Sequence, residues 1–347
     1  MIDLSCNYLG LNLRNPVVVG SSGLTSSLEN LRTIDKMGAG AVVLKSIFEE
    51  QIEFETGKLL ESDNPSVKAW NEAFKEIISR DEYFYDEAFE YLTGYAREHS
   101  LAQYLTLVTK AKEELSIPVI ASINCNTTRE WQFFAKKLQD AGADAIELNI
   151  YVLPSDFLKS GKENEDVYFN IIHEVQKYVT VPVSVKSGYY FSALAGTLLK
   201  LSESGIAGLT LFNRPYNPDI DIEEFKVTAS NIFSNETEYA HTLRWVALLS
   251  GKLKCDIAAS SGIHDYATVV KQLLAGADVV HMASAFYRSH PDHFVIIPEI
   301  LAGIRSWMHD HNFEKISDFK GMLSSSRINN PAAYERVQFL RLFSSVI

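Results

Sequence analysis

The sequence predicts a single (β/α)8 barrel, because eight short apolar runs alternate with segments that mostly carry helical patterns. Four of these runs belong to a phrase that recurs along the chain, and the other four lie between its copies. Strands that alternate with helices favour parallel βαβ units. Eight such units suggest closure into a barrel, with a doubly wound open sheet as the structural alternative. No GxGxxG motif follows the first run, which argues against a dinucleotide-binding sheet.

The recurring phrase consists of a helix end, a glycine, a short polar step and a largely apolar run. Its copies occupy residues 36–44, 140–148, 203–210 and 274–280. Glycine suits the left-handed residue just past a helix C-terminus. A short apolar run is typical of a parallel strand that is covered on both faces.

The interleaved runs cover residues 16–20, 117–121, 181–185 and 255–259. Three of them carry a proline at the start, where the ladder of hydrogen bonds has not yet begun. Helical spacing of apolar residues is clear in residues 130–141 and 266–275.

The length of 347 residues fits one domain that spans residues 1–347. Residues 47–100, after the second predicted strand, form an unusually long interval that is rich in aromatic and acidic residues. Loops of this length are seldom structureless in a compact domain. We expect a partly helical insertion over the C-terminal face of the barrel, where active sites lie. A peripheral or oligomer-facing insertion is the alternative.

The composition indicates an ordinary soluble globular protein, with 46% hydrophobic and 22% charged residues. The net charge of −12 and the lack of a long basic run argue against nucleic acid or an anionic membrane as the main partner. No apolar run reaches the roughly 20 residues that span a bilayer. Cys6, Cys125 and Cys255 have no metal-like or disulfide-like spacing, so free thiols in the cytoplasm are expected.

Polar side chains follow the predicted strands, at the barrel face that carries chemistry. Lys45 and Lys186 each close a largely apolar strand, and a buried lysine is costly without an anionic or hydrogen-bonding partner. We expect both to contact a ligand, with a structural ion pair as the alternative. The other residues at strand ends, most of them polar, are Ser21-Ser22-Gly23, Ser46, Ser122, Asn124, Asn149, Asn213, Ser260-Ser261-Gly262 and Ala283-Ser284.

The last two predicted strands end in small residues, Ser261-Gly262 and Ala283-Ser284. Small residues let backbone amides approach a ligand closely, and the loops after strands seven and eight often bind phosphate in this fold. A plain tight turn is the alternative for either pair alone. No catalytic triad, HExxH helix or Walker loop is visible. His264 and His281 lack a convincing metal-ligand pattern, and no metal site is predicted.

Eight motifs in chain order resemble the dihydroorotate dehydrogenase family, class 1 more than class 2. The opening Asn15-Pro16-Val17 with Ser22-Gly23 is similar to N-P-x-x-x-x-S-G, and residues 39–46 are similar to A-G-A-x-x-x-K-S/T. Glu147-Leu148-Asn149 resembles the E-L-N that opens the catalytic loop, and residues 182–186 resemble P-x-x-V-K. Further matches are Asn213, residues 260–263, Ala283-Ser284 and the I-x-D-F-x-G of residues 316–321. The resemblance is weakest over residues 47–100 and 216–238.

The resemblance implies FMN and an oxidoreductase that converts dihydroorotate to orotate in pyrimidine biosynthesis. It also implies a homodimer, and electrons that leave through a redox partner or a soluble acceptor. The residues implied around the isoalloxazine and ribityl chain are Ser22, Gly23, Lys45, Ser46, Asn149, Lys186 and Asn213. Those implied at the phosphate are Ser261, Gly262, Ala283 and Ser284. Lys186 is the candidate that stabilises negative charge on the reduced flavin.

The substrate half of the family pattern is altered. Val152 stands where class 1 has its catalytic cysteine, and Pro154 stands where it has a substrate-binding asparagine. The asparagine-rich substrate motif after strand two is also missing. Three hypotheses follow: dihydroorotate or a close analogue with a substitute base among Ser155, Asp156 and Tyr151; a flavoprotein oxidoreductase for another substrate; or a non-catalytic flavin-binding protein.

Overall fold

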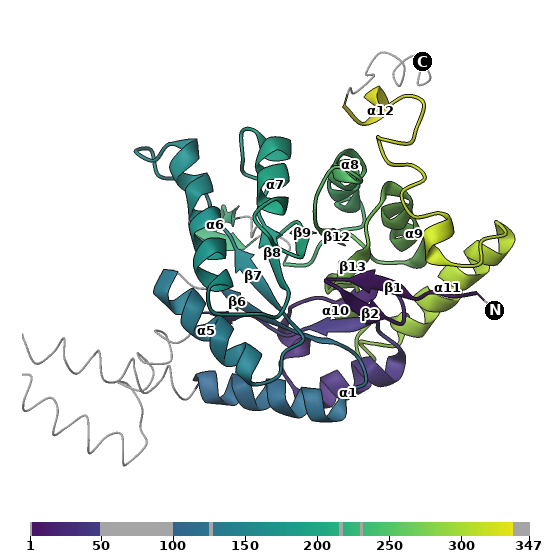
Figure 1. The fold of residues 1–347 in the computed structure, drawn as a ribbon, viewed down its shortest axis with the longest axis horizontal. Helices are drawn as coiled ribbons and strands as arrows, with labels where there is room; N and C mark the ends of the chain where they lie inside the picture. Colours follow the sequence, from purple (N-terminus) through teal and green to yellow (C-terminus); the bar gives the residue numbers. More distant parts are fainter. Residues whose placement is uncertain (1, 49–99, 125–127, 215–217, 230–231, 336–347) are drawn as a thin grey trace, which may run out of the picture.

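The computed structural model describes residues 2–48, 100–124, 128–214, 218–229 and 232–335. Within them, parallel strands form a closed barrel with helices around it (Figure 1). The eight strands of the barrel are β3 (Val17–Val19), β4 (Ala41–Val43), β6 (Val119–Asn124), β7 (Ala145–Ile150), β8 (Val183–Ser187), β9 (Gly208–Leu211), β12 (Asp256–Ser260) and β13 (Val279–Met282). The predicted (β/α)8 barrel is therefore confirmed.

The barrel closes because each of the eight strands pairs in parallel with two neighbouring strands. The hydrogen-bonded order is β4-β3-β13-β12-β9-β8-β7-β6, and the additional pairing of β4 with β6 closes the ring. A short further strand, β5 (Ile47–Phe48), pairs with the end of β6. All eight strands run in the same direction, so their C-terminal ends meet at one mouth.

The helices lie outside the ring of strands. They are α1 (Leu28–Met37), residues 100–114, α5 (Thr128–Asp140), α6 (Gly161–Gln176), α7 (Leu194–Ser202), α8 (Tyr239–Leu249), α9 (Tyr266–Ala275), α10 (Ser284–Arg288), α11 (Ile296–Asp310) and α12 (Ala332–Glu335). The short helical turns η1 (Gly23–Thr25) and η2 (Ile316–Asp318) follow β3 and α11. The glycines of the recurring phrase, Gly38, Gly142, Gly205 and Gly276, all have positive φ. This confirms the expected left-handed residue after a helix end.

Alternate residues of each strand face opposite sides, as a strand geometry requires. Val17, Val42, Val119 and Leu209 belong to the large core between strands and helices. Their neighbours belong to a smaller cluster inside the barrel, which includes Val18, Ala41, Val43, Ile120, Ala145, Ala258 and Val279. The interior is thus a packed core, and polar residues replace apolar ones toward the C-terminal mouth.

A hairpin of β1 (Cys6–Tyr8) and β2 (Leu11–Leu13) closes the N-terminal mouth. Tyr8 and Leu9 belong to the interior cluster, and the backbone N–H of Leu9 donates to Asp256 Oδ2 at 2.7 Å. Asp256 is the first residue of β12, which fixes the hairpin at the end opposite the predicted site. The C-terminal mouth is therefore the end at which a ligand can enter.

The predicted insertion over residues 47–100 falls mainly on residues 49–99, which lie outside the described residues. After β9, strands β10 (Pro218–Asp221) and β11 (Lys226–Ala229) form an antiparallel hairpin. None of the helices in the described part of the chain is both long enough and apolar enough to cross a bilayer. Cys6 and Cys255 are free thiols, and Cys125 is outside the described residues.

A substitution at Gly40, just before β4, tests how tightly β4 packs against β3. A Cβ atom at Gly40 would lie 2.0 Å from the backbone oxygen of Asn15, which cannot move without displacing β3. Overpacking of this kind costs about 1–3 kcal/mol or more. We expect Gly40→Ala to lower the free energy of unfolding by at least that amount in urea denaturation.

Gly161→Ala is the matched control, because a Cβ atom there meets nothing within 4 Å and the residue begins α6. That change should leave stability equal or raise it by about 0.4–1 kcal/mol. Equal stability of the two variants would contradict the packing described for β3 and β4.

Candidate ligand site at the C-terminal mouth

A cavity of about 480 Å³ opens at the C-terminal mouth, within the usual size range of small-molecule sites. Its walls come from the loops after β3, β9, β12 and β13 and from the segment that precedes α8. The lining residues are Ser21, Ser22, Gly23, Lys186, Asn213, Arg214, Ile232, Phe233, Ser234, Ser260, Ser261, Gly262, Ile263, His281, Met282, Ala283, Ser284 and Tyr287.

The cavity brings together eight of the residues that the sequence singled out for a cofactor. They are Ser22, Gly23, Lys186, Asn213, Ser261, Gly262, Ala283 and Ser284. Lys45, Ser46 and Asn149 are not part of this wall. Ser46 and Asn149 are buried immediately behind it, and Lys45 is half-buried at the end of β4.

Lys186 is half-buried on β8, and its side chain makes no hydrogen bond or ion pair with any described residue. No described carboxylate lies within ion-pair distance of Lys186, and its charge acts on the buried Glu147 from farther away. A lysine ammonium at a cavity wall is a compact positive charge with three donors. It can bind an anionic group or a carbonyl oxygen of a ligand.

A buried carboxyl group lies below this lysine, inside the barrel. Glu147 on β7 is 1% exposed, accepts from Thr210 Oγ1 at 3.0 Å and accepts from Ser122 Oγ at 3.4 Å. Burial raises the pKa of Glu147 above its ordinary value, and the charge of Lys186 and the two hydroxyl donors oppose that rise. The group can therefore hold a proton more readily than an exposed carboxylate.

His281 on β13 faces the same carboxyl group. Its Nδ1 lies 3.6 Å from Glu147 Oε2, and its Nε2 is buried without a partner among the described residues. Burial, and secondarily the charge of Lys186, lower the pKa of His281 to about 3. The imidazole is therefore neutral near pH 7, and it does not form a true salt bridge with Glu147.

Serine hydroxyls connect the interior carboxyl group to the cavity wall. Ser122 Oγ lies 2.8 Å from Ser46 Oγ, which lies 3.2 Å from Ser21 Oγ. Ser21 lines the cavity. Asn149 Nδ2 also donates to Ser46 Oγ at 3.3 Å, and Asn149 Oδ1 accepts from Asn213 Nδ2 at 2.5 Å. These bonds fix the side chains that end five different strands relative to one another.

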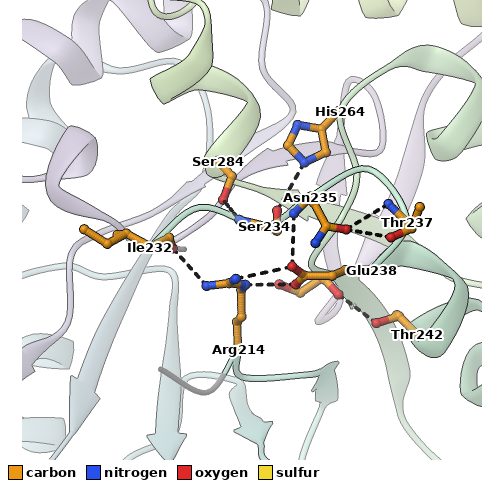
Figure 2. A network of polar contacts seen from close by, with 10 residues as sticks. Arg214, Ile232, Ser234, Asn235, Thr237, Glu238, Thr242, His264 and Ser284 are labelled. Carbon is orange, nitrogen blue, oxygen red and sulfur yellow. Dashed lines mark hydrogen bonds and ion pairs between the residues drawn. The ribbon is translucent and has the colours of Figure 1, made fainter. Parts of the chain in front are cut away.

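A second polar network covers the other side of the cavity (Figure 2). Arg214 donates from Nε and Nη2 to the two carboxylate oxygens of Glu238, at 2.9 and 3.2 Å, and from Nη1 to the backbone oxygen of Ile232. Ser234 donates its backbone N–H to Ser284 Oγ at 3.0 Å, and its hydroxyl lies 3.2 Å from His264 Nε2. The segment after the β10–β11 hairpin is thereby fastened to the end of β13.

The three predicted catalytic candidates do not line the cavity. Ser155 and Asp156 are exposed, and Asp156 lies 4.0 Å from the ammonium of Lys159. Tyr151 is half-buried with its ring against Tyr190, and burial raises its pKa to about 12. Val152 is also half-buried and packs against the main core. None of these side chains is among the residues that line the cavity with Lys186 and Asn213.

Sequence reasoning missed several residues of the site. Arg214, Phe233 and Ser234 lie in or beside a segment with weak family resemblance, where no motif marked them. Glu147 was noted only as part of a motif, although an acidic residue within an apolar strand is a signal of an interior role. His281 interrupts the last strand in the same way. No group of three metal-ligating side chains occurs in the described residues.

The fold and the site together define a (β/α)8 barrel with a cavity of small-molecule size at the C-terminal mouth. The sequence profile of the dihydroorotate dehydrogenase family matches residues 96–308. This chain belongs to that family.

Curated relatives agree over almost the whole chain. A putative dihydroorotate dehydrogenase A (fumarate) of Aeropyrum pernix is 26% identical over 328 residues, which cover 92% of this chain and 97% of the relative. A dihydroorotate dehydrogenase B (NAD(+)) catalytic subunit of Pyrococcus furiosus is 27% identical over 330 residues, 92% and 99% respectively. The corresponding subunit of Thermoplasma volcanium is 25% identical, with 93% and 99% covered.

The neutral state of His281 predicts how stability depends on pH. Between about pH 6.5 and 3, the unfolded chain binds a proton at this position and the folded chain does not, so stability falls as the pH falls. The loss has a slope of at most about 1.4 kcal/mol per pH unit. We expect His281→Gln to lose less stability over this range than the unmodified protein, in urea unfolding at several pH values.

His309→Gln is the control, since His309 is an exposed histidine near the end of α11. It should follow the unmodified protein across the whole range. An identical pH dependence for His281→Gln would show that His281 is not held neutral in the folded state.

Proposed function

We propose that this chain is an FMN-dependent oxidoreductase that oxidises a CH–CH bond, as its family relationship suggests. The observation that carries the proposal is that one cavity wall holds Lys186, which makes no hydrogen bond or close ion pair with a described residue, and small residues at the ends of β12 and β13. The relatives' names attach different acceptors, fumarate and NAD(+), to proteins of this family. The proposal therefore concerns the oxidation of the substrate and names no electron acceptor.

The lining residues fit FMN in size and chemistry. Ser261 and Gly262 both have positive φ, a turn that exposes backbone groups beside Ala283 and Ser284. These residues would hold the phosphate. Ile263, Met282 and Tyr287 supply apolar surface, and Lys186 and Asn213 supply donors for polar edges of the ring system. Ser22 and Gly23 would lie beside the same ring, and Lys45, Ser46 and Asn149 would support that end of the cavity from behind.

When bound, FMN would accept two electrons from the substrate. Lys186 would stabilise negative charge that develops near it, because a fixed positive charge acts strongly in a site of low dielectric. Asn213 is held by Asn149, so its amide is oriented before a ligand arrives. Phe233 and Tyr287, with ring centroids 5.0 Å apart, form an apolar wall on that side of the cavity.

We also propose that the substrate differs from dihydroorotate or reacts from an altered pose. Val152 cannot accept a proton, and Ser155 and Asp156 are exposed in the segment that follows it. Tyr151, Ser155 and Asp156 remain candidates for a substitute base if the loop moves over a bound substrate. Arg214 adds a guanidinium beside Asn213 to the polar groups at this wall.

We expect one FMN per chain, bound without a covalent link and released by heat. Lys186→Ala should weaken FMN binding by about 10- to 100-fold, because it removes a charged hydrogen-bond donor worth about 1.5–3 kcal/mol. Lys45→Ala should retune the flavin spectrum or potential without unfolding the barrel. Fluorescence titration with FMN measures the affinity.

Lys200→Ala is the matched control, because Lys200 is exposed in the last turn of α7. It should bind FMN like the unmodified protein. A colourless protein that takes up no added FMN would overturn the cofactor assignment, and unchanged affinity in Lys186→Ala would overturn the role of that lysine.

Dihydroorotate should reduce the bound flavin slowly, while dithionite reduces it readily. A positioned base contributes about 10²- to 10⁴-fold in rate, and residue 152 offers none. Anaerobic stopped-flow bleaching at saturating dihydroorotate measures this, with Val152→Cys as the variant that restores a thiol. Rapid bleaching by the unmodified protein would refute the prediction.

A further inference from the structure

Three serine hydroxyls and one carboxyl group form a continuous path from the cavity to the middle of the barrel. We propose that Ser21, Ser46 and Ser122 relay a proton between a molecule bound in the cavity and Glu147. The path does not include residue 152. The relay depends on the proposed function in one respect, that FMN fills the cavity in the loaded protein.

The contacts are short enough for hydrogen bonds at each step. Ser21 Oγ lies 3.2 Å from Ser46 Oγ, Ser46 Oγ lies 2.8 Å from Ser122 Oγ, and Ser122 Oγ lies 3.4 Å from Glu147 Oε1. Ser21 and Ser46 follow the C-terminal ends of β3 and β4, while Ser122 and Glu147 lie within β6 and β7. In-register pairing of Ser122 with Glu147 places the last two members side by side on adjacent strands.

The direction of these bonds follows from counting donors. An ionised Glu147 can only accept, so Ser122 donates to it and must accept from Ser46. Since the one proton of Ser46 is then used, Ser21 donates to Ser46. Ser46 Oγ also accepts from Asn149, and its backbone N–H donates to Ser21 Oγ at 2.9 Å. Ser21 then retains one lone pair for a donor in the cavity.

The proton transfer is balanced along this path. One proton leaves the bound molecule for Ser21 Oγ, each hydroxyl passes its own proton to the next oxygen, and Glu147 receives the last one. No electrons move, and one negative charge is transferred from Glu147 to the bound molecule. With Glu147 protonated, every bond in the chain points the other way, and the reverse transfer returns the proton to the cavity.

The surroundings of Glu147 suit a group that changes its charge. Lys186 stabilises the ionised form, and His281 faces the carboxyl group as a neutral ring. The phenols of Tyr8 and Tyr104 are the other titratable groups that interact with it, and burial raises the pKa of both. Burial raises the pKa of Glu147, so the carboxylate is a stronger base than an exposed one.

Infrared spectroscopy after a pH jump tests the relay in the full-length protein. The carbonyl band of protonated Glu147 is assigned by its loss in Glu147→Gln, and its rate of change measures proton exchange. Ser122→Ala should slow this exchange by about 10²-fold, as expected when a positioned proton-transfer group is lost. Ser184→Ala is the matched control, because Ser184 is a buried serine paired with Glu147 on the opposite neighbouring strand and bonds instead to the backbone oxygen of Ile146.

Loading with FMN is the second measurement. FMN that fills the cavity should slow exchange in the unmodified protein toward the rate of Ser122→Ala. Equal rates in Ser122→Ala, Ser184→Ala and the unmodified protein would overturn the relay and leave the hydroxyls with a structural role. Tight FMN binding that leaves exchange unchanged would also overturn it. Failure to bind FMN would refute the proposed function, while the comparison of the two serine variants would still decide the relay.

Discussion

Closure of the parallel sheet by pairing of β4 with β6 is the constraint on which the site depends. Once the ring closes, all eight strand ends meet at one mouth, and every second residue of each strand must fit inside the barrel. The N-terminal hairpin occupies the other mouth through Tyr8 and Leu9. Closure therefore brings Glu147 of β7 and His281 of β13 together across the barrel, with Glu147 Oε2 3.6 Å from His281 Nδ1.

The interior polar layer carries an energetic cost that a packed barrel does not require. A buried carboxyl group without good partners destabilises a protein, and here Glu147 has two hydroxyl donors and a neutral histidine at 3.6 Å. An apolar residue at that position would fill the barrel more simply. Lys186 above it likewise makes no ion pair with a described residue. Glu147 lies behind the cavity and Lys186 on its wall, where a ligand would give the lysine a partner.

The sequence predicted the barrel well because its signals are local. The glycines at 38, 142, 205 and 276 each mark a helix end, and an apolar run follows each one. The rule that ligands of this fold bind at the C-terminal ends of the strands also predicted that Lys186 and Ser284 lie at one site. Phe233 and Ser234 were missed because the chain reaches the cavity there only after the β10–β11 hairpin, and Arg214 was missed although it directly follows Asn213. The pairing of Glu147 with His281 depends on closure across the barrel, which no local pattern reveals.

A crystal structure of the protein saturated with FMN tests the central claim most directly. The account predicts flavin density in the C-terminal cavity, with the phosphate against Ser261-Gly262 and Ala283-Ser284 and the ring system within reach of Lys186 and Asn213. Flavin bound elsewhere, or a reversed pose with its phosphate at Lys186, would contradict the assignment of this cavity.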